Sequence, residues 1–217
     1  MAQQLVLALA GTIRHDGNGG VADDLADVAG LTAWLEAQAE PLAGYAGGLA
    51  APVQPPPGYA DGLEAVAGWV DEPLRLDVVA LRRAVRTLFA RSVRPAPPSR
   101  ADRATLLDPQ DAVDQLNRAA GRWPVRPVLS WPDGGAPAVT WSGGPADART
   151  RLLAGLARAA IEFLAGPDRE RLAACPAPRC VRYFLKGHPR QEWCKASCGN
   201  RARVSRHYHR RAADRPG

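Results

Sequence analysis

The feature that most constrains this chain is a group of four cysteines within 24 residues near its C-terminal end. They are Cys175, Cys180, Cys194 and Cys198, spaced as C-x4-C, a loop of 13 residues, and C-x3-C. Two close pairs separated by a loop suit tetrahedral coordination, because each pair forms a tight turn and the loop folds one pair against the other. Zinc favours thiolates, and four of them complete its coordination shell. The spacing therefore predicts one Zn²⁺ per chain in a structural site.

Other uses of the four cysteines are less favoured. Two disulfides would need an oxidising compartment, and no secretory signal is visible, because the apolar run at 5–10 follows no Lys or Arg and is too short to span a membrane. Four free thiols would not be expected to cluster so closely. His188 lies in the central loop and is a minor alternative ligand. We therefore expect a cytoplasmic protein with no membrane partner.

The charge of the chain is divided unevenly along its length. Residues 169–217 contain thirteen Lys and Arg but three Asp and Glu, a net charge of +10, whereas residues 1–168 carry −4. Such an asymmetry is typical of a module that binds a polyanion, although a solvated basic tail has the same composition.

A helix is expected after the second cysteine pair. At about 100° per residue, Arg203, Arg206 and Arg210 share one side and form an outward basic ridge. Val204, Tyr208 and Ala212 fall on the other side, where we expect a small core. Arg201 points the same way, so it is expected to stack on Trp193 and to offset the charge of the thiolates. Lys195, inside the second pair, is a further candidate phosphate contact.

The rest of the chain predicts a mainly α-helical domain with one small β-hairpin, an α+β arrangement. Residues 41–60 are rich in Pro, Gly and Ala, and Pro55–Pro57 exclude regular helix. The first expected elements are a buried strand or helix start at 5–10, a loop at 15–20 and a helix over 28–35. Two further helices are expected, one with Asp77 as its N-cap and one with Asp108 as N-cap and Pro109 as its first residue. A hairpin over 125–142 and a helix over about 145–165 follow.

Two expectations concern side chains of this helical part. Arg82, Arg83 and Arg86 are expected to form a solvated face, because the apolar residues of their helix repeat elsewhere. Most of the six tryptophans are expected in the core. No Cys–His pair, Ser–His–Asp set or paired carboxylates stand at a convincing spacing, so an enzyme is the least favoured class.

The stretch CPAPRCVRYFLKGHPRQEWCKASCGNRARVSRHYHRR, at 175–211, resembles the CGNR zinc-finger family. In that family both cysteine pairs bind zinc, and the second pair leads into the naming tetrapeptide, here Cys198-Gly199-Asn200-Arg201. The resemblance implies a small, treble-knuckle-like module that ends in a helix, with Trp193, Gly199, Asn200 and Arg201 as structural support.

The preceding residues resemble the ABATE-type domain that commonly precedes this finger in actinobacterial and related bacterial proteins. The resemblance rests on apolar residues near Thr12 and Trp34, on Gln115-Leu116-Asn117, and on the helix at 152–164. The family has an Asp and an Asn before the threonine, where this chain has Ala8 and Gly11. The expected domains are 1–168 and 169–217.

The resemblance implies a stress-related transcription regulator or an RNA-binding zinc-ribbon protein. Our first hypothesis is a DNA-binding regulator whose helical domain senses a small-molecule effector or forms a homodimer. RNA binding is the alternative, because a basic zinc knuckle serves either nucleic acid. A third hypothesis is an interaction module that binds an acidic protein without nucleic acid.

Overall fold

The computed structural model describes residues 2–45 and 68–213, with side chains up to residue 208. In chain order the elements are α1 (Ala2–Gly11), β1 (Ile13–His15), β2 (Val21–Asp23), α2 (Val28–Ala37), α3 (Ala39–Ala43), α5 (Glu72–Ser92), the 3-10 helix η1 (Arg100–Asp102), α6 (Pro109–Gly121), β3 (Val125–Ser130), β4 (Ala138–Gly143), α7 (Ala148–Ala165), the 3-10 helix η2 (Pro167–Arg171), β5 (Leu172–Ala174), β6 (Tyr183–Leu185) and α8 (Ala196–Ala213). Pro55–Pro57, predicted to exclude helix, lie outside the described residues.

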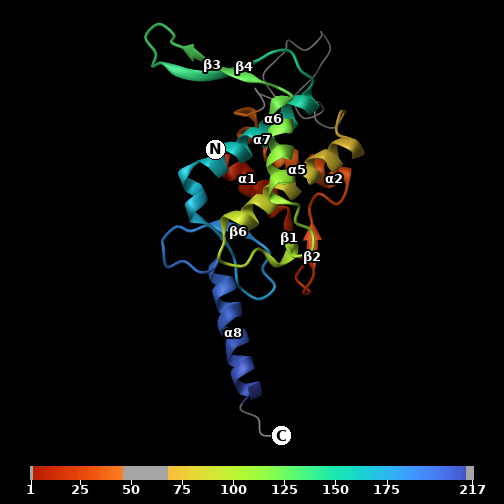
Figure 1. Cartoon of the computed structure of the whole chain (residues 1–217), viewed down its shortest axis with the longest axis vertical. Coiled ribbons are helices and arrows are strands. Elements are labelled where there is room, and N and C mark those ends of the chain that lie inside the picture. The colour runs from red at the N-terminus through yellow and green to blue at the C-terminus, as the bar shows by residue number, and fades with distance from the viewer. Residues whose placement is uncertain (1, 46–67, 214–217) are drawn as a thin grey trace.

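Helices α1, α5, α6 and α7 pack together around the main hydrophobic core (Figure 1). Phe89 of α5 lies deep in it, with its ring centroid 5.4 Å from that of Phe163 in α7. In α2, α5, α6 and α7, the apolar residues that repeat at helical spacing form faces that point into the interior. The buried residues on these faces include Leu31, Trp34, Leu35, Val78, Leu81, Val85, Leu88, Leu116, Leu152 and Leu156. In the described ranges, no helix is both long and apolar enough to cross a membrane.

The helix starts are set by carboxylates that accept backbone N–H groups left free in the first turn. Asp108 caps α6 as predicted, by accepting from the N–H of Gln110. One predicted start is wrong, because α5 begins at Glu72 and its N-cap is Asp71, which accepts from the N–H of Leu74. Helix α7, predicted from about residue 145, begins at Ala148 after its N-cap Asp147. The apolar repeat at 78–88 did not include the first turn of α5, so Asp77 was mistaken for the cap.

The predicted solvated face of α5 is wrong for two of its three arginines. Arg83 is exposed, but Arg82 and Arg86 are only 5% and 4% exposed. Val78, Arg82 and Arg86 are spaced four residues apart, so they lie along the same side of α5, and Val78 is buried. Each meets a carboxylate from a distant part of the chain, Asp23 for Arg82 and Asp102 for Arg86. Ion pairing therefore allows charged side chains on a face that also packs against the core.

The loop predicted at 15–20 joins a short hairpin that periodicity did not indicate. Strands β1 and β2 pair antiparallel with His15 opposite Val21. Asp16 holds the turn, because its Oδ1 accepts the N–H groups of Asn18 and Gly20. Gly17 and Gly19 have positive φ angles of 95° and 108°, a backbone conformation that side chains disfavour. The hairpin places Asp23 beside α5.

The predicted hairpin at 125–142 is confirmed as β3 and β4, which pair antiparallel with Leu129 opposite Val139. It projects from one end of the molecule (Figure 1), and one of its faces carries only apolar side chains along the ladder. Trp131 and Trp141 are 67% and 57% exposed there. The other four tryptophans agree with the expectation that most lie in the core, since Trp34 and Trp123 are buried and Trp69 and Trp193 are half-buried against the main and the small core.

The C-terminal part of the fold begins with the hairpin β5–β6, in which Ala173 lies opposite Phe184. Leu172 and Tyr183 from these strands belong to the same hydrophobic core as the helices. A second, smaller core contains three of the cysteines together with Ala177 and Phe184. Helix α8 leaves this small core and projects away from the body, at the end opposite to β3–β4 (Figure 1). The mainly helical part with small hairpins, followed by a cysteine cluster and a final helix, is the architecture predicted.

Candidate metal centre and nucleic-acid interface

The sulfurs of Cys175, Cys180, Cys194 and Cys198 lie together, all within 4.8 Å of one another. The Cys194 sulfur is 3.8 Å from that of Cys180 and 3.5 Å from that of Cys198. Zn–S bonds of about 2.3 Å place the sulfurs of a tetrahedral site about 3.8 Å apart. The four cysteines therefore fit one Zn²⁺ per chain, as the spacing predicts.

Each cysteine pair closes a tight turn. The N–H of Cys180 donates to the carbonyl of Ala177, and the N–H of Cys198 donates to the carbonyl of Lys195, both at 3.0 Å. The N–H of Cys175 donates to the carbonyl of Arg182, so the first pair flanks the end of the β5–β6 ladder. His188 is exposed and does not belong to the cluster.

The close packing of four thiols that can ionise favours a bound cation. Hydrogen bonds from the Cys180 and Cys194 side chains, and from the Cys194 backbone N–H, lower the pKa of the Cys175 thiol. Side-chain hydrogen bonds with Cys175 and then with Cys180 raise the pKa of the Cys194 thiol. Ionisation of one sulfur therefore opposes ionisation of its neighbour, because two thiolates at this distance repel each other. A divalent cation with an affinity for thiolates removes this conflict.

Trp193 and Gly199 pack against each other beside the cluster. A Cβ atom at position 199 would lie 3.1 Å from Cε3 of the Trp193 ring, so a larger residue would push the ring away. Gly199 is buried in the first turns of α8, one residue after Cys198. Glycine there lets the helix approach the loop that carries Cys194. The structure thus brings both residues to the place where the sequence predicts structural support.

Arg201 and Asn200 turn to different neighbours. The Nη2 of Arg201 donates to the Cys198 sulfur at 3.1 Å, and this contact raises the pKa of the Arg201 guanidinium. Asn200 instead accepts a hydrogen bond from Arg203. Among the described side chains, arginine–aromatic stacking joins Arg86 to Tyr183 and Arg158 to Trp123, so the expected stacking of Arg201 on Trp193 is not seen. Arg201 lies where it can offset sulfur charge.

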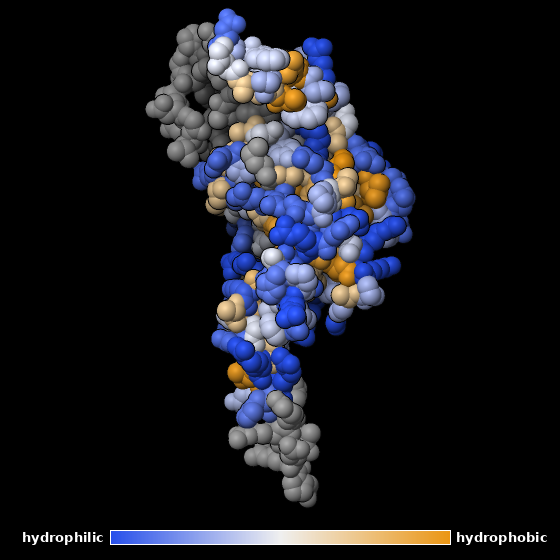
Figure 2. Space-filling model, turned by 90° about the vertical axis from the view of Figure 1, so that its left-hand side faces the viewer, coloured by the Kyte–Doolittle hydropathy of each residue, from blue (hydrophilic) through white to orange (hydrophobic). Residues whose placement is uncertain are grey.

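The exposed surface of α8 is more extensive than expected. Arg203, Arg206 and Lys195 are exposed, and the side chain of Arg210 lies outside the described residues. Val204 and Tyr208 are 55% and 69% exposed, so the expectation that they face a small core is wrong. The helix has left the body at this point and has no core to cover. Figure 2 shows its surface as largely hydrophilic.

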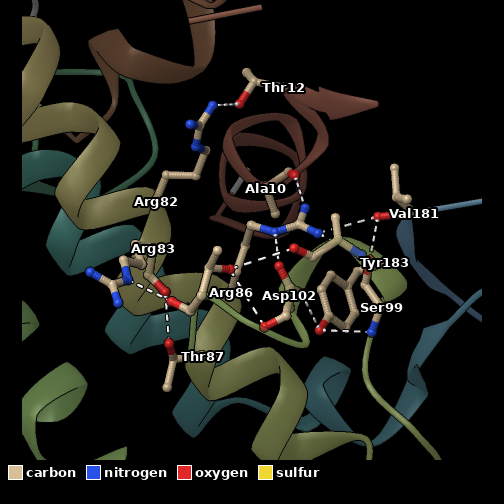
Figure 3. Close-up of polar contacts among 12 residues, drawn as sticks. Ala10, Thr12, Arg82, Arg83, Arg86, Thr87, Ser99, Asp102, Val181 and Tyr183 are labelled. Carbon is tan, nitrogen blue, oxygen red and sulfur yellow. Dashed lines mark hydrogen bonds and ion pairs between the residues drawn. The ribbon is translucent and has the colours of Figure 1, made fainter. Parts of the chain in front are cut away.

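A buried polar network connects the metal centre to the helical part (Figure 3). Arg86 donates through Nε to Asp102 at 2.6 Å and through Nη2 to the carbonyl of Val181 at 3.3 Å. Ser99 also donates to that carbonyl, at 2.9 Å. The hydroxyl of Tyr183 donates to the other oxygen of Asp102 at 2.7 Å, and burial, followed by the Asp102 charge, raises the pKa of Tyr183. Val181 directly follows Cys180, so the network ends beside the metal centre.

Sequence reasoning did not find this network. The four-residue spacing of Val78, Arg82 and Arg86 was an available signal that the two arginines share a buried row. No local signal marks Ser99 or Asp102, because both partners are reached only through the fold.

Replacing Arg201 by glutamine is expected to weaken zinc retention before it affects folding. The substitution removes a charged donor from the Cys198 sulfur, and loss of such an outer contact typically weakens metal affinity about 10- to 100-fold. The measurement is competition for zinc with a chromogenic chelator, with Arg206→Gln as the matched control because it removes the same charge from the exposed part of α8. Equal zinc affinity in wild type and Arg201→Gln would contradict the assigned role.

Comparison with known proteins agrees with this architecture. Residues 3–167 match the ABATE family model, described as "Putative stress-induced transcription regulator", and residues 171–211 match the CGNR zinc finger. A comparison with curated proteins found no match. The first family model covers well over half of the chain. The chain therefore belongs to the ABATE family and carries a CGNR zinc finger after the ABATE region.

Proposed function

We propose that the protein is a zinc-dependent DNA-binding transcriptional regulator. The four cysteines hold one zinc ion, which fixes the start of α8, and α8 contacts the nucleic acid. The helical domain, which we place at residues 1–168, senses a ligand or forms a homodimer, and the finger occupies residues 169–217. The ABATE and CGNR matches support a zinc-binding regulator rather than an enzyme.

The observation that carries the proposal is the projecting basic helix. Helix α8 contains five arginines and no Asp or Glu, and Arg203 and Arg206 are exposed. An α-helix fits the major groove of B-DNA, which is about 12 Å wide, and phosphates attract arginine without regard to sequence. Lys195, Arg203, Arg206 and Arg210 are the proposed nucleic-acid contacts. Because α8 stands away from the body, a duplex can approach it without meeting the helical part.

RNA is the second candidate, and one observation favours it. Tyr208 is 69% exposed and lies on α8 between arginines, and an exposed aromatic ring can stack on an unpaired base. Competition between duplex DNA and single-stranded RNA at matched salt separates the two candidates. Tyr208→Ala is expected to weaken RNA binding much more than DNA binding if bases stack on the ring.

Replacing Arg203, Arg206 and Arg210 together by glutamine is expected to weaken binding to every DNA sequence and to flatten its salt dependence. Each lost phosphate contact lowers the slope of log affinity against log salt by about one unit. The measurement is a salt titration of binding by fluorescence anisotropy. The matched control replaces Arg118, Arg122 and Arg126, which are exposed on the helical part and its hairpin, and so changes the net charge equally.

Zinc content should be the same in both triple variants, because the substitutions leave the four cysteines and Arg201 in place. If the α8 variant binds as tightly as wild type at every salt concentration, α8 is a solvated surface. An interaction with an acidic protein, tested by a pull-down that survives nuclease, would then become the leading hypothesis.

A further inference from the structure

A groove of about 530 Å³ lies on the helical part, between the β1–β2 hairpin, α5 and the segment that follows η1. Three arginines of α5 contribute to its lining, Arg82, Arg83 and Arg86, together with Asp23 and Asp102. The groove is thus lined by both of the ion pairs of Arg82 and Arg86 that the sequence did not predict.

The charged floor of this groove is rigidly held. Arg82 donates through two nitrogens to the two carboxylate oxygens of Asp23, at 2.5 and 2.7 Å, and also to the hydroxyl oxygen of Thr12 at 2.9 Å. Although burial opposes ionisation of Asp23, the hydrogen bonds from Arg82 and from the N–H of Leu25 lower the pKa of its carboxyl. Arg86 meets Asp102 deeper in the structure through Nε alone, at 2.6 Å. Each carboxylate of the lining is thus paired with its own arginine.

Arg83 is the cation of the groove that has no carboxylate partner among the described residues. Its Nε donates to the backbone carbonyl of Thr105, in the segment after η1, at 2.5 Å, and this contact orients the guanidinium. With three arginines and two aspartates, the lining keeps one positive charge in excess. An arginine that is oriented through Nε still presents its terminal N–H groups as a fork for a carboxylate.

The walls of the groove are apolar. Val21 and Leu106 line it and are 52% and 36% exposed, and Val79 of α5 also contributes to the lining. Apolar side chains left open to water beside a fixed cation favour a ligand that has an apolar body and one acidic group. A free inorganic anion would leave these walls uncovered.

We propose that this groove binds a small organic carboxylate, with the acid group on Arg83 and the apolar body against Val21, Val79 and Leu106. The proposal deepens the sensing role given above to the helical domain, but the binding itself does not depend on nucleic acid. Asp102 connects the groove to the metal centre, since one of its oxygens accepts from Arg86 and the other from Tyr183 of β6.

The test titrates the zinc-loaded full chain with hexanoate, with hexanamide as the uncharged analogue of equal size and acetate as the acid without an apolar body. Binding is followed by calorimetry and by the midpoint of thermal unfolding. Hexanoate is expected to bind and to raise the midpoint, with roughly tenfold or greater preference over hexanamide, because a charged hydrogen bond is lost in the amide. Acetate is expected to bind more weakly than hexanoate.

Two variants locate the site. Arg83→Gln, at an exposed position, is expected to fold normally and to lose the preference for hexanoate over hexanamide, whereas Arg118→Gln, an exposed arginine of α6, should keep it. No saturable binding of hexanoate at millimolar concentration, or an unchanged preference in Arg83→Gln, would overturn the proposal. The triple α8 variant should bind hexanoate like wild type, so failure of the DNA proposal and failure of this proposal are distinguishable.

Discussion

Replacing Cys180 by serine is expected to abolish stoichiometric zinc binding and to unfold the finger. The small core around the cluster contains little besides the cysteines themselves, with Ala177 and Phe184 as its other buried members. Such a core cannot stay folded without metal, because structural zinc supplies about 10–16 kcal/mol of apparent binding free energy in modules of this size. Elemental analysis should give one zinc per wild-type chain and far less in the variant.

The same experiment tests how independent the two parts are. Independent domains at 1–168 and 169–217 would leave the helical domain unchanged on chelation, but Leu172 and Tyr183 lie in its core. We therefore expect the helices to remain folded without zinc, with an unfolding midpoint several degrees lower. The measurement is helical circular dichroism during heating, with and without chelator. Loss of all helical signal in one step on chelation would show that a boundary at residue 168 does not separate two folding units.

The second large effect is expected for Asp102→Ala. The substitution leaves the buried guanidinium of Arg86 without its carboxylate, and breaking one partner of a buried ion pair costs about 3–5 kcal/mol. Asp168→Ala is the matched control, because Asp168 pairs with Arg171 on the surface. Such exposed pairs contribute about 0–1 kcal/mol. Urea unfolding of the zinc-loaded proteins gives both free energies.

The rate of zinc release tests whether the loss of Asp102 also affects the finger. Asp102 also accepts from Tyr183 of β6, so the variant should release zinc to a chelator faster than wild type. A change in unfolding free energy of less than about 1 kcal/mol would show that the Arg86–Asp102 pair stabilises the protein no more than an exposed ion pair does.

The zinc site was predictable because all its candidate ligands are close in sequence. Two turns and one loop bring Cys175 and Cys198 together, so spacing and coordination chemistry were sufficient. The faces of α8 were not predictable in the same way. Periodicity correctly separates Val204 and Tyr208 from the arginines, but it does not say whether anything packs against either side.

In the helical part, too, some features were predictable from the sequence and others were not. Apolar periodicity located the buried faces, whereas Arg82 and Arg86 were misassigned because charged residues are ordinarily solvated. Their burial depends on Asp23 and Asp102, which come from a hairpin and a 3-10 helix far along the chain. The groove beside them could therefore not be inferred until the fold had placed these carboxylates.

The exposed face of the β3–β4 hairpin carries two tryptophans that differ optically from the buried ones. Trp131 and Trp141 are open to water and Trp34 and Trp123 are shielded in the interior, whereas Trp69 and Trp193 are half-buried. Iodide in solution should quench the emission of the first pair and leave that of the second nearly intact. Any molecule that covers the hairpin, including a second copy of the chain, would protect the quenchable fraction. The fluorescence of the unlabelled protein therefore reports directly on whether this face is free or covered.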